Sequence, residues 1–149
     1  MSTPRYLAID FGLKRVGLAV CGPDSDMVFP LKTIVRTTRE TFFAELLTTI
    51  QIENIQAVVI GLPLDLDGNE TLITRQAKNF ASSLTRRISL PVYQENEALT
   101  SFEAKSRLDD AGVYGKKRKK VLDQMAAVAI MESFLTHPTD REPVVRPDQ

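Results

Sequence analysis

Two patterns of apolar residues alternate along this chain, one typical of strands and the other typical of helices. Short apolar runs between turn residues indicate strands, and the continuous run at 55–60 is typical of a strand covered on both faces. Apolar residues four positions apart, as at Phe42, Leu46 and Ile50, indicate the buried face of a helix. We predict strands at residues 5–9, 16–21, 31–36, 55–60 and 91–95, a helix that begins at Thr38, and further helices at 71–87, 101–111 and 121–135.

The order of these elements predicts a single α/β domain. Gly12, in the short connection between the first two strands, indicates a hairpin, and the later strand–helix–strand segment predicts a right-handed parallel crossover. A chain of 149 residues is long enough for one such domain with its own core. We place the domain at residues 1–137. Residues 138–149 hold three prolines and few apolar residues, and we interpret them as a flexible tail.

The composition is that of a soluble globular protein and argues against a membrane or secreted protein. The chain has 43% apolar and 26% charged residues, as ordinary soluble globular proteins have. No apolar stretch approaches the roughly 20 residues that span a bilayer, and the N-terminus lacks the basic and apolar segments of a secretory signal. Cys21 is the single cysteine, which excludes an intramolecular disulfide and a cysteine metal site. We therefore expect a cytoplasmic protein without a membrane partner.

Charge is balanced overall but uneven along the chain. The net charge of zero weakens a nucleic-acid hypothesis, because domains that bind nucleic acids are often basic. Five consecutive cations nevertheless form a predicted loop before the last helix, and Lys14 and Arg15 form a smaller pair in the first hairpin. The five cations are Lys116, Lys117, Arg118, Lys119 and Lys120. Such a run is either a solvated loop or a contact for a nucleic-acid backbone.

Three carboxylates lie at the ends or edges of apolar elements. Asp10 ends the first strand, Glu97 follows the strand at 91–95, and Asp123 lies on the apolar stripe of the last helix. In open α/β sheets, sites form beyond the carboxyl ends of the strands. Asp10, the loop at 61–68 and Glu97 all follow such ends, so we expect them to converge if their strands are parallel neighbours.

These carboxylates need a compensating charge if they are buried, and a shared divalent cation supplies one. Phosphodiester hydrolysis uses such cations to activate water and to neutralise charge on oxygen. Mg²⁺ prefers carboxylate oxygens as ligands, so the three carboxylates indicate a metal-dependent phosphodiester enzyme. Taken singly, each carboxylate has another explanation: Asp10 as a turn cap, Glu97 as a carboxylate at a helix entry, and Asp123 as a partner of the basic run.

Three short motifs follow one another along the chain. Residues 8–20 (AIDFGLKRVGLAV) look like an Asp-x-Gly-x-Lys-Arg-x-Gly hairpin, residues 58–63 (VVIGLP) with 67–68 (DG) form a second motif, and residues 122–127 (LDQMAA) look like an Asp-x-x-Ala-Ala helix. In this order and spacing they resemble the YqgF family. These are Holliday-junction-resolvase-like proteins of the ribonuclease H-like superfamily, described as nucleases for the 5′ end of pre-16S ribosomal RNA. The resemblance covers nearly the whole predicted domain.

The resemblance implies a fold, a reaction and a set of residues. The fold is a ribonuclease H-like mixed sheet of five strands flanked by helices, with the first three strands antiparallel and the others parallel to the first. Asp10, Glu97 and Asp123 become the catalytic and metal-binding triad for Mg²⁺ or Mn²⁺, and Lys14 and Arg15 become phosphate contacts. The implied substrate is structured precursor ribosomal RNA, with branched DNA as the alternative. We expect a monomer or a weak homodimer.

A further family motif, which reads Asp-Glu-Arg, is expected between the second and the last of these motifs, and here the chain departs from the pattern. Here it is Asn96-Glu97-Ala98, so one charge and a guanidinium suited to phosphate are missing. The departure favours a second hypothesis, a nucleic-acid-binding module with impaired catalysis. We expect the basic run to close over a nucleic-acid backbone. A sugar-kinase or actin-like ATPase also opens with Asp-x-Gly, but those proteins duplicate this fold, and 149 residues hold one copy.

Overall fold

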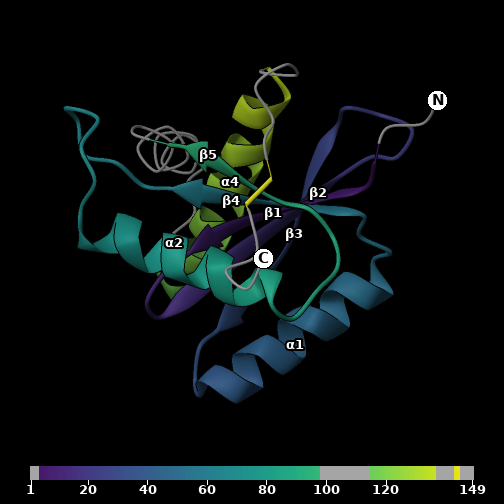
Figure 1. The fold of residues 1–149 in the computed structure, drawn as a ribbon, viewed down its shortest axis with the longest axis horizontal. Coiled ribbons are helices and arrows are strands. Elements are labelled where there is room, and N and C mark those ends of the chain that lie inside the picture. The colour runs from purple at the N-terminus through teal and green to yellow at the C-terminus, as the bar shows by residue number, and fades with distance from the viewer. Residues whose placement is uncertain (1–3, 98–114, 137–142, 145–149) are drawn as a thin grey trace.

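The computed structural model describes residues 4–97, 115–136 and 143–144. In this part of the chain a five-stranded sheet lies between helices, with α1 and α2 on one face and α4 on the other (Figure 1). The strands are β1 (Tyr6–Phe11), β2 (Arg15–Cys21), β3 (Val28–Val35), β4 (Ala57–Leu62) and β5 (Val92–Asn96). The helices are α1 (Arg39–Ile52), α2 (Leu72–Thr85) and α4 (Gly115–Leu135).

The sheet is mixed, as the sequence predicts. Its strand order is β3-β2-β1-β4-β5, with antiparallel pairing from β3 through β2 to β1 and parallel pairing from β1 through β4 to β5. Helix α1 connects β3 to β4, and α2 connects β4 to β5. The three parallel strands therefore end at one edge of the sheet, which confirms the predicted fold class and the predicted convergence.

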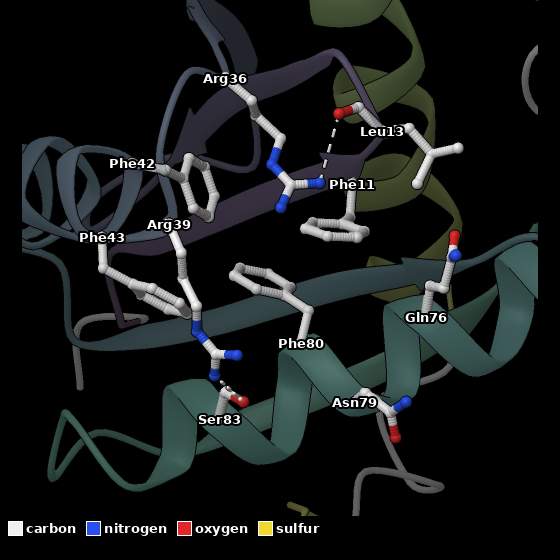
Figure 2. Close-up of a pocket in the computed structure, with 10 residues that line it drawn as sticks. All are labelled: Phe11, Leu13, Arg36, Arg39, Phe42, Phe43, Gln76, Asn79, Phe80 and Ser83. Carbon is white, nitrogen blue, oxygen red and sulfur yellow. Dashed lines mark hydrogen bonds between the residues drawn. The ribbon is translucent and has the colours of Figure 1, made fainter.

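Alternate residues of the central strands serve two separate cores, because successive side chains of a strand point to opposite faces. On β1, Leu7, Ile9 and Phe11 pack on the side of α1 and α2, whereas Tyr6 and Ala8 pack on the side of α4. Phenylalanine rings from β1, α1 and α2 meet in the first core (Figure 2). The second core is rich in alanine, so α4 lies close to the sheet.

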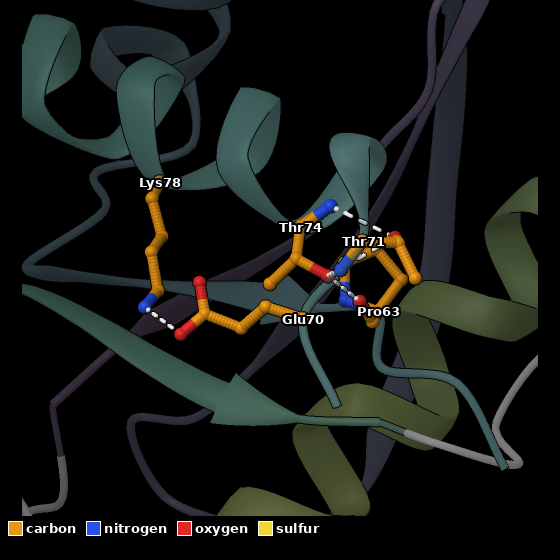
Figure 3. A network of polar contacts seen from close by, with 5 residues as sticks. All are labelled: Pro63, Glu70, Thr71, Thr74 and Lys78. Carbon is orange, nitrogen blue, oxygen red and sulfur yellow. Dashed lines mark hydrogen bonds and ion pairs between the residues drawn. The ribbon is translucent and has the colours of Figure 1, made fainter. Parts of the chain in front are cut away.

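Both connecting helices begin with threonine caps. The hydroxyl of Thr38 accepts the N–H of Thr41 at 3.1 Å ahead of α1. Ahead of α2, Thr71 and Thr74 form a reciprocal capping box (Figure 3). The Thr74 hydroxyl also donates to the carbonyl oxygen of Pro63. This bond ties the segment after β4 to the first turn of α2, beside the edge where the parallel strands end.

β3 and α4 both begin earlier than the hydrophobic pattern predicts. β3 starts at Val28 rather than at residue 31 and includes Pro30, which is tolerated because β3 lies at the edge of the sheet. α4 starts at Gly115 rather than at residue 121, so the basic run at 116–120 is helical and the predicted loop there is wrong. Lysine and arginine are good helix formers, but a run of cations carries no apolar period.

Two predicted segments lie wholly or largely outside the described residues. They are the helix at 101–111 and the tail at 138–149, of which the structure describes 143–144. There, Val144 packs against the first core, and its N–H donates to the carbonyl oxygen of Val92 at 2.6 Å. No helix among the described residues is long and apolar enough to cross a membrane.

Candidate active site

The three predicted carboxylates come from three elements that meet at one edge of the sheet. Asp10 is the penultimate residue of β1 and is half-buried. Glu97 directly follows β5, is 7% exposed, and its N–H donates to the carbonyl oxygen of Leu62 at 3.1 Å, which continues the β4–β5 pairing. Asp123 lies in the first half of α4 and is also half-buried. We call these three residues the carboxylate site.

Two strand glycines make room for the carboxylate site. A Cβ atom at Gly61 of β4 would lie 2.9 Å from both Cδ and Oε1 of Glu97. Gly17 of β2 pairs with Asp10, and a Cβ atom there would collide with the backbone carbonyl of Asp123. Contacts this short do not occur between real atoms, so glycine at both positions lets Glu97 and α4 approach the end of β1.

Side-chain hydrogen bonds fix α4 against the sheet on both sides of Asp123. The hydroxyl of Thr33 in β3 donates to the carbonyl oxygen of Lys120 at 2.7 Å and accepts from Nε2 of Gln124 at 3.1 Å. Farther along the helix, the Ser133 hydroxyl donates to Oε2 of Glu95 in β5 at 2.6 Å. The rotation of α4 about its axis is thereby set, and with it the direction of the Asp123 side chain.

The pKa values of the three carboxyl groups are raised because the groups are buried near one another. Burial, and then the charge of Asp123, raise the pKa of Asp10 to about 7. Burial, and then the charge of Asp10, raise the pKa of Glu97 to about 9. Burial also raises the pKa of Asp123, against the opposing effect of Arg15. The three groups therefore repel one another electrostatically, as carboxylates grouped around one position do.

Arg15 supplies a cation inside the site. Its Nε donates to Oδ2 of Asp123 at 2.8 Å, and the two side chains are 32% and 17% exposed. From the sequence, Arg15 was predicted to contact a phosphate, and the basic run was an alternative partner for Asp123. Among the described residues the two pair with each other instead, so Arg15 positions Asp123.

The donor set suits a hard divalent cation. Oε2 of Glu97 is buried and has no hydrogen-bond partner among the described residues, and such an oxygen is a natural cation ligand. Asp10, which raises the pKa of Glu97, supplies a second carboxylate. No group of three or more Asp, Glu, His or Cys side chains within the described ranges is already arranged to hold a metal ion. A third carboxylate ligand from Asp123 would bind beside its hydrogen bond to Arg15, which occupies Oδ2.

Apart from Arg15, the cations predicted to contact nucleic acid, and Asn96 beside Glu97 in the sequence, are exposed where the structure describes their side chains. Lys14 is exposed in the β1–β2 turn. Lys119 and Lys120 are exposed on α4. The remaining three cations of the run are described as helical backbone. Asn96 ends β5 and is exposed, and Ala98 lies outside the described residues.

Sequence reasoning missed the residues that shape the site rather than carry its charge. These are Gly17, Gly61, Thr33 and Gln124, together with the pairing of Arg15 to Asp123. Glycine inside a predicted strand was the available signal, since a strand glycine often marks a close approach of another segment. Nothing in the sequence alone shows that a β3 hydroxyl would meet the start of α4.

Comparison with known proteins identifies a family and relatives that match most of this chain. Residues 4–137 match the family described as RuvX, Holliday junction resolvase. A protein of Oleidesulfovibrio alaskensis named "Putative pre-16S rRNA nuclease" is 53% identical over 137 residues, which are 92% of this chain and 95% of that protein. A protein of the same name from Maridesulfovibrio salexigens is 51% identical over 131 residues, 88% of this chain and 97% of that one.

Solved structures show the same fold at low sequence identity. The structure titled "T. thermophilus RuvC in complex with Holliday junction substrate" has a TM-score of 0.54 and 16% identity, and the match covers 95% of this chain and 99% of that one. A second structure, "Thermus thermophilus RuvC structure", has a TM-score of 0.53 and 16% identity, with 94% and 99% covered. Because the family match spans nearly the whole domain and confirms the resemblance carried by the three motifs, the chain belongs to the RuvX family of Holliday junction resolvases.

Proposed function

We propose that this protein is a metal-dependent nuclease that hydrolyses phosphodiester bonds at the 5′ end of pre-16S ribosomal RNA. The observation that carries the proposal is the buried Oε2 of Glu97, which has no hydrogen-bond partner among the described residues and lies in a group of mutually repelling carboxylates. The names of the relatives supply the substrate class. We propose that the enzyme acts on this RNA in the cytoplasm, as a monomer or a weak homodimer.

Asp10 and Glu97 would hold Mg²⁺ or Mn²⁺, and Asp123 would complete the ligand set. When bound, the cation supplies an activated water and neutralises charge on the phosphodiester oxygens. Without a cation, the raised pKa values leave Glu97 protonated and Asp10 partly protonated at neutral pH, and both would release protons when a cation binds. Arg15 lowers the pKa of Asp123 against the larger effect of burial, and its hydrogen bond fixes the carboxylate at this edge.

The surroundings of the carboxylate site are suited to a nucleic-acid backbone. Lys14 in the β1–β2 turn and Lys119 and Lys120 on α4 are exposed, and each can meet a phosphate group. We propose that the whole basic run at 116–120 contacts the substrate. Because the run is helical, it would meet the substrate along α4, rather than as a loop that folds over it.

Branched DNA is the second candidate substrate, and the family description as Holliday junction resolvase favours it. Asn96 and the motif's missing arginine favour a third outcome, a module that binds nucleic acid with impaired catalysis. Both alternatives use the same face of the sheet, so they differ in substrate and in rate rather than in location.

The experiment is cleavage of a 5′-extended pre-16S RNA and of a four-way DNA junction with Mg²⁺, Mn²⁺ or a chelator. Asp10→Asn removes one carboxylate, and Asp24→Asn, at an exposed position outside the site, is the matched control. We expect RNA cleavage that needs the cation, survives Asp24→Asn and disappears in Asp10→Asn. Cleavage of the junction alone would replace RNA by branched DNA. Binding of either substrate without cleavage would support the impaired module.

A further inference from the structure

A pocket opens on the opposite face of the sheet from the carboxylate site. It has a volume of about 240 Å³ and lies between the end of β1, α1 and α2 (Figure 2). Its position follows from strand alternation, because Asp10 points toward α4 and the next residue, Phe11, points toward α1 and α2. The volume is below the roughly 300–1,000 Å³ of pockets for drug-sized ligands, so the pocket can enclose about one ring system, with any attached group at its rim.

Aromatic side chains form one wall of the pocket. Phe11 and Phe80 are stacked, with ring centroids 4.5 Å apart, and the Phe42 ring lies 5.7 Å from that of Phe80. The guanidinium of Arg36 lies over Phe11 and Phe42, with Cζ 4.8 and 5.4 Å from the two centroids. These rings are at most 9% exposed, so the half-buried guanidinium of Arg36 is the surface of this wall on which a nucleobase can stack.

Two arginines of the pocket have no carboxylate partner among the described residues. Arg36 donates through Nη1 to the carbonyl oxygens of Gly12 and Leu13, at 3.2 and 3.4 Å. Arg39 donates through Nη2 to the hydroxyl of Ser83 at 3.0 Å. All these acceptors are neutral, so both guanidinium charges are available to an anion.

The pocket also contains an acceptor that lacks a donor. Oε1 of Gln76, on α2, is buried and has no hydrogen-bond partner among the described residues. A buried amide oxygen without a partner costs free energy, so a ligand with an N–H or O–H group would be favoured there. An aromatic wall, two uncompensated guanidiniums and one unmatched acceptor together describe a planar anion with a hydrogen-bond donor.

We propose that this pocket binds one nucleotide. The base would stack on the guanidinium of Arg36 and donate to Oε1 of Gln76, and the phosphate would lie at Arg39. The nucleotide comes either free from solution or as an unpaired nucleotide of a nucleic acid. The second source rests on the proposed nuclease function. Since Asp10 and Phe11 are neighbours in β1, a strand crossing this edge of the sheet could reach both faces.

The test uses adenosine 5′-monophosphate, adenosine, inorganic phosphate and a short oligoadenylate, each titrated by calorimetry in chelator so that no cleavage occurs. Arg39→Gln removes the exposed guanidinium, and Gln76→Met replaces the amide by an apolar group of similar length. Arg75→Gln is the matched control, because Arg75 is exposed on α2 and does not line the pocket. Thermal unfolding of each variant shows whether it keeps the fold.

We expect the monophosphate to bind about tenfold more tightly than adenosine or phosphate alone. Arg39→Gln should weaken its binding about tenfold, whereas Arg75→Gln should leave it unchanged. Binding of the oligoadenylate as well assigns the pocket to a nucleic acid, and binding of the monophosphate alone assigns it to a free nucleotide. No binding of either, or binding that Arg39→Gln and Gln76→Met leave unchanged, overturns the proposal. Because Asp10→Asn should spare this binding, the proposal can fail or hold independently of nuclease activity.

Discussion

At the end of β1, two consecutive residues lead to opposite chemistry on the two faces of the sheet. On the α4 face, Asp10 meets other carboxylates, whose pKa values are raised by burial and by one another. On the α1–α2 face, Phe11 meets stacked rings and arginines without carboxylate partners among the described residues. The carboxylates of the first face outnumber the one arginine paired with them, so that face suits a cation, whereas the arginines of the second face have no carboxylate partner among the described residues and suit an anion. One sheet edge can therefore offer two different sites because strand residues alternate.

The two faces also differ in how tightly they are packed. On the α4 face, glycines let a helix backbone and a carboxylate approach the strands, with no room for a methyl group. On the other face, a cavity of about 240 Å³ remains between the phenylalanines and arginines. We expect the carboxylate site to be sensitive to volume and charge, and the pocket to be sensitive mainly to charge.

The largest effect should come from adding volume on the α4 face. In Gly17→Ala, the new methyl group would collide with the Asp123 carbonyl, so α4 must move from the sheet. Overpacking typically lowers the free energy of unfolding by roughly 1–3 kcal/mol. We expect a loss of about 3 kcal/mol here, because the colliding atoms belong to the backbone, which cannot yield as a flexible side chain can. Chemical denaturation measures the loss. Ser83→Ala, which removes one hydroxyl at the pocket, should cost less than 1 kcal/mol, and equal losses would remove the contrast in packing.

The second effect concerns pH and the two most perturbed carboxyl groups. The folded protein keeps protons on Asp10 up to about pH 7 and on Glu97 up to about pH 9, while the unfolded chain loses them near 3.8 and 4.5. Stability contributed by these groups is thus present at acidic pH and is lost as pH rises through these folded-state pKa values. In chelator, Glu97→Gln should match the wild type near pH 5 and exceed it in melting temperature at pH 9.

Divalent cations should reverse that pH effect. A cation that binds the ionised site stabilises the folded protein, so Mg²⁺ should raise the melting temperature of the wild type at pH 9 and leave Glu97→Gln nearly unchanged. The same scans at pH 5 should show little response, because protons then compete with the cation. A melting temperature of the wild type that is independent of both pH and Mg²⁺ would show that the carboxylates are not coupled as described.

A smaller effect should follow from removing the cation inside the carboxylate site. In Arg15→Gln, Asp123 loses the partner that lowers its pKa, so that pKa should rise further. The pair is partly exposed, and we expect a loss of about 1 kcal/mol in stability. Titration by NMR and denaturation measure the two changes. Lys14→Gln, its exposed neighbour, should leave both unchanged while weakening nucleic-acid binding and reducing its salt dependence.

The smallest effect on stability should come from the pocket. Arg39 is exposed and bonded to a single neutral hydroxyl, so Arg39→Gln should change the free energy of unfolding by less than about 0.5 kcal/mol. Its effect should fall on nucleotide binding, with Mg²⁺ binding untouched. If Arg39→Gln weakened cation binding at the carboxylate site, the two faces would not be the separate sites described above.

The sequence predicts the fold and the charged residues of the site well, because both follow from simple patterns. Apolar runs fix the strands, and carboxylates at the ends of parallel strands must converge, as Asp10 and Glu97 do. The helical start of α4 was missed since cations at 116–120 carry no apolar period. The pairing of Arg15 with Asp123 was missed because 108 positions separate them, and only the packing of α4 on β2 brings them together.

The pocket lay outside the reach of sequence reasoning for a related reason. Phe42 is a predicted core residue, and nothing in the spacing of the apolar residues shows that a cavity remains beside it. Arg36 and Arg39 are ordinary surface cations in the sequence. Neither arginine has a carboxylate partner among the described residues, and only the packing of α1 and α2 on the sheet shows this. Patterns along the chain predict which residues are buried, whereas unmatched polar atoms depend on neighbours from distant segments.

The most direct test of the central claim is Mn²⁺ binding, measured from the loss of the free-ion signal in electron paramagnetic resonance. The wild type, Glu97→Gln and the exposed control Asp24→Asn would be compared at pH 8. If the buried Oε2 of Glu97 is a cation ligand, the wild type and Asp24→Asn bind Mn²⁺ equally and Glu97→Gln binds it at least about tenfold more weakly. Equal Mn²⁺ binding by Glu97→Gln and the wild type would contradict the account.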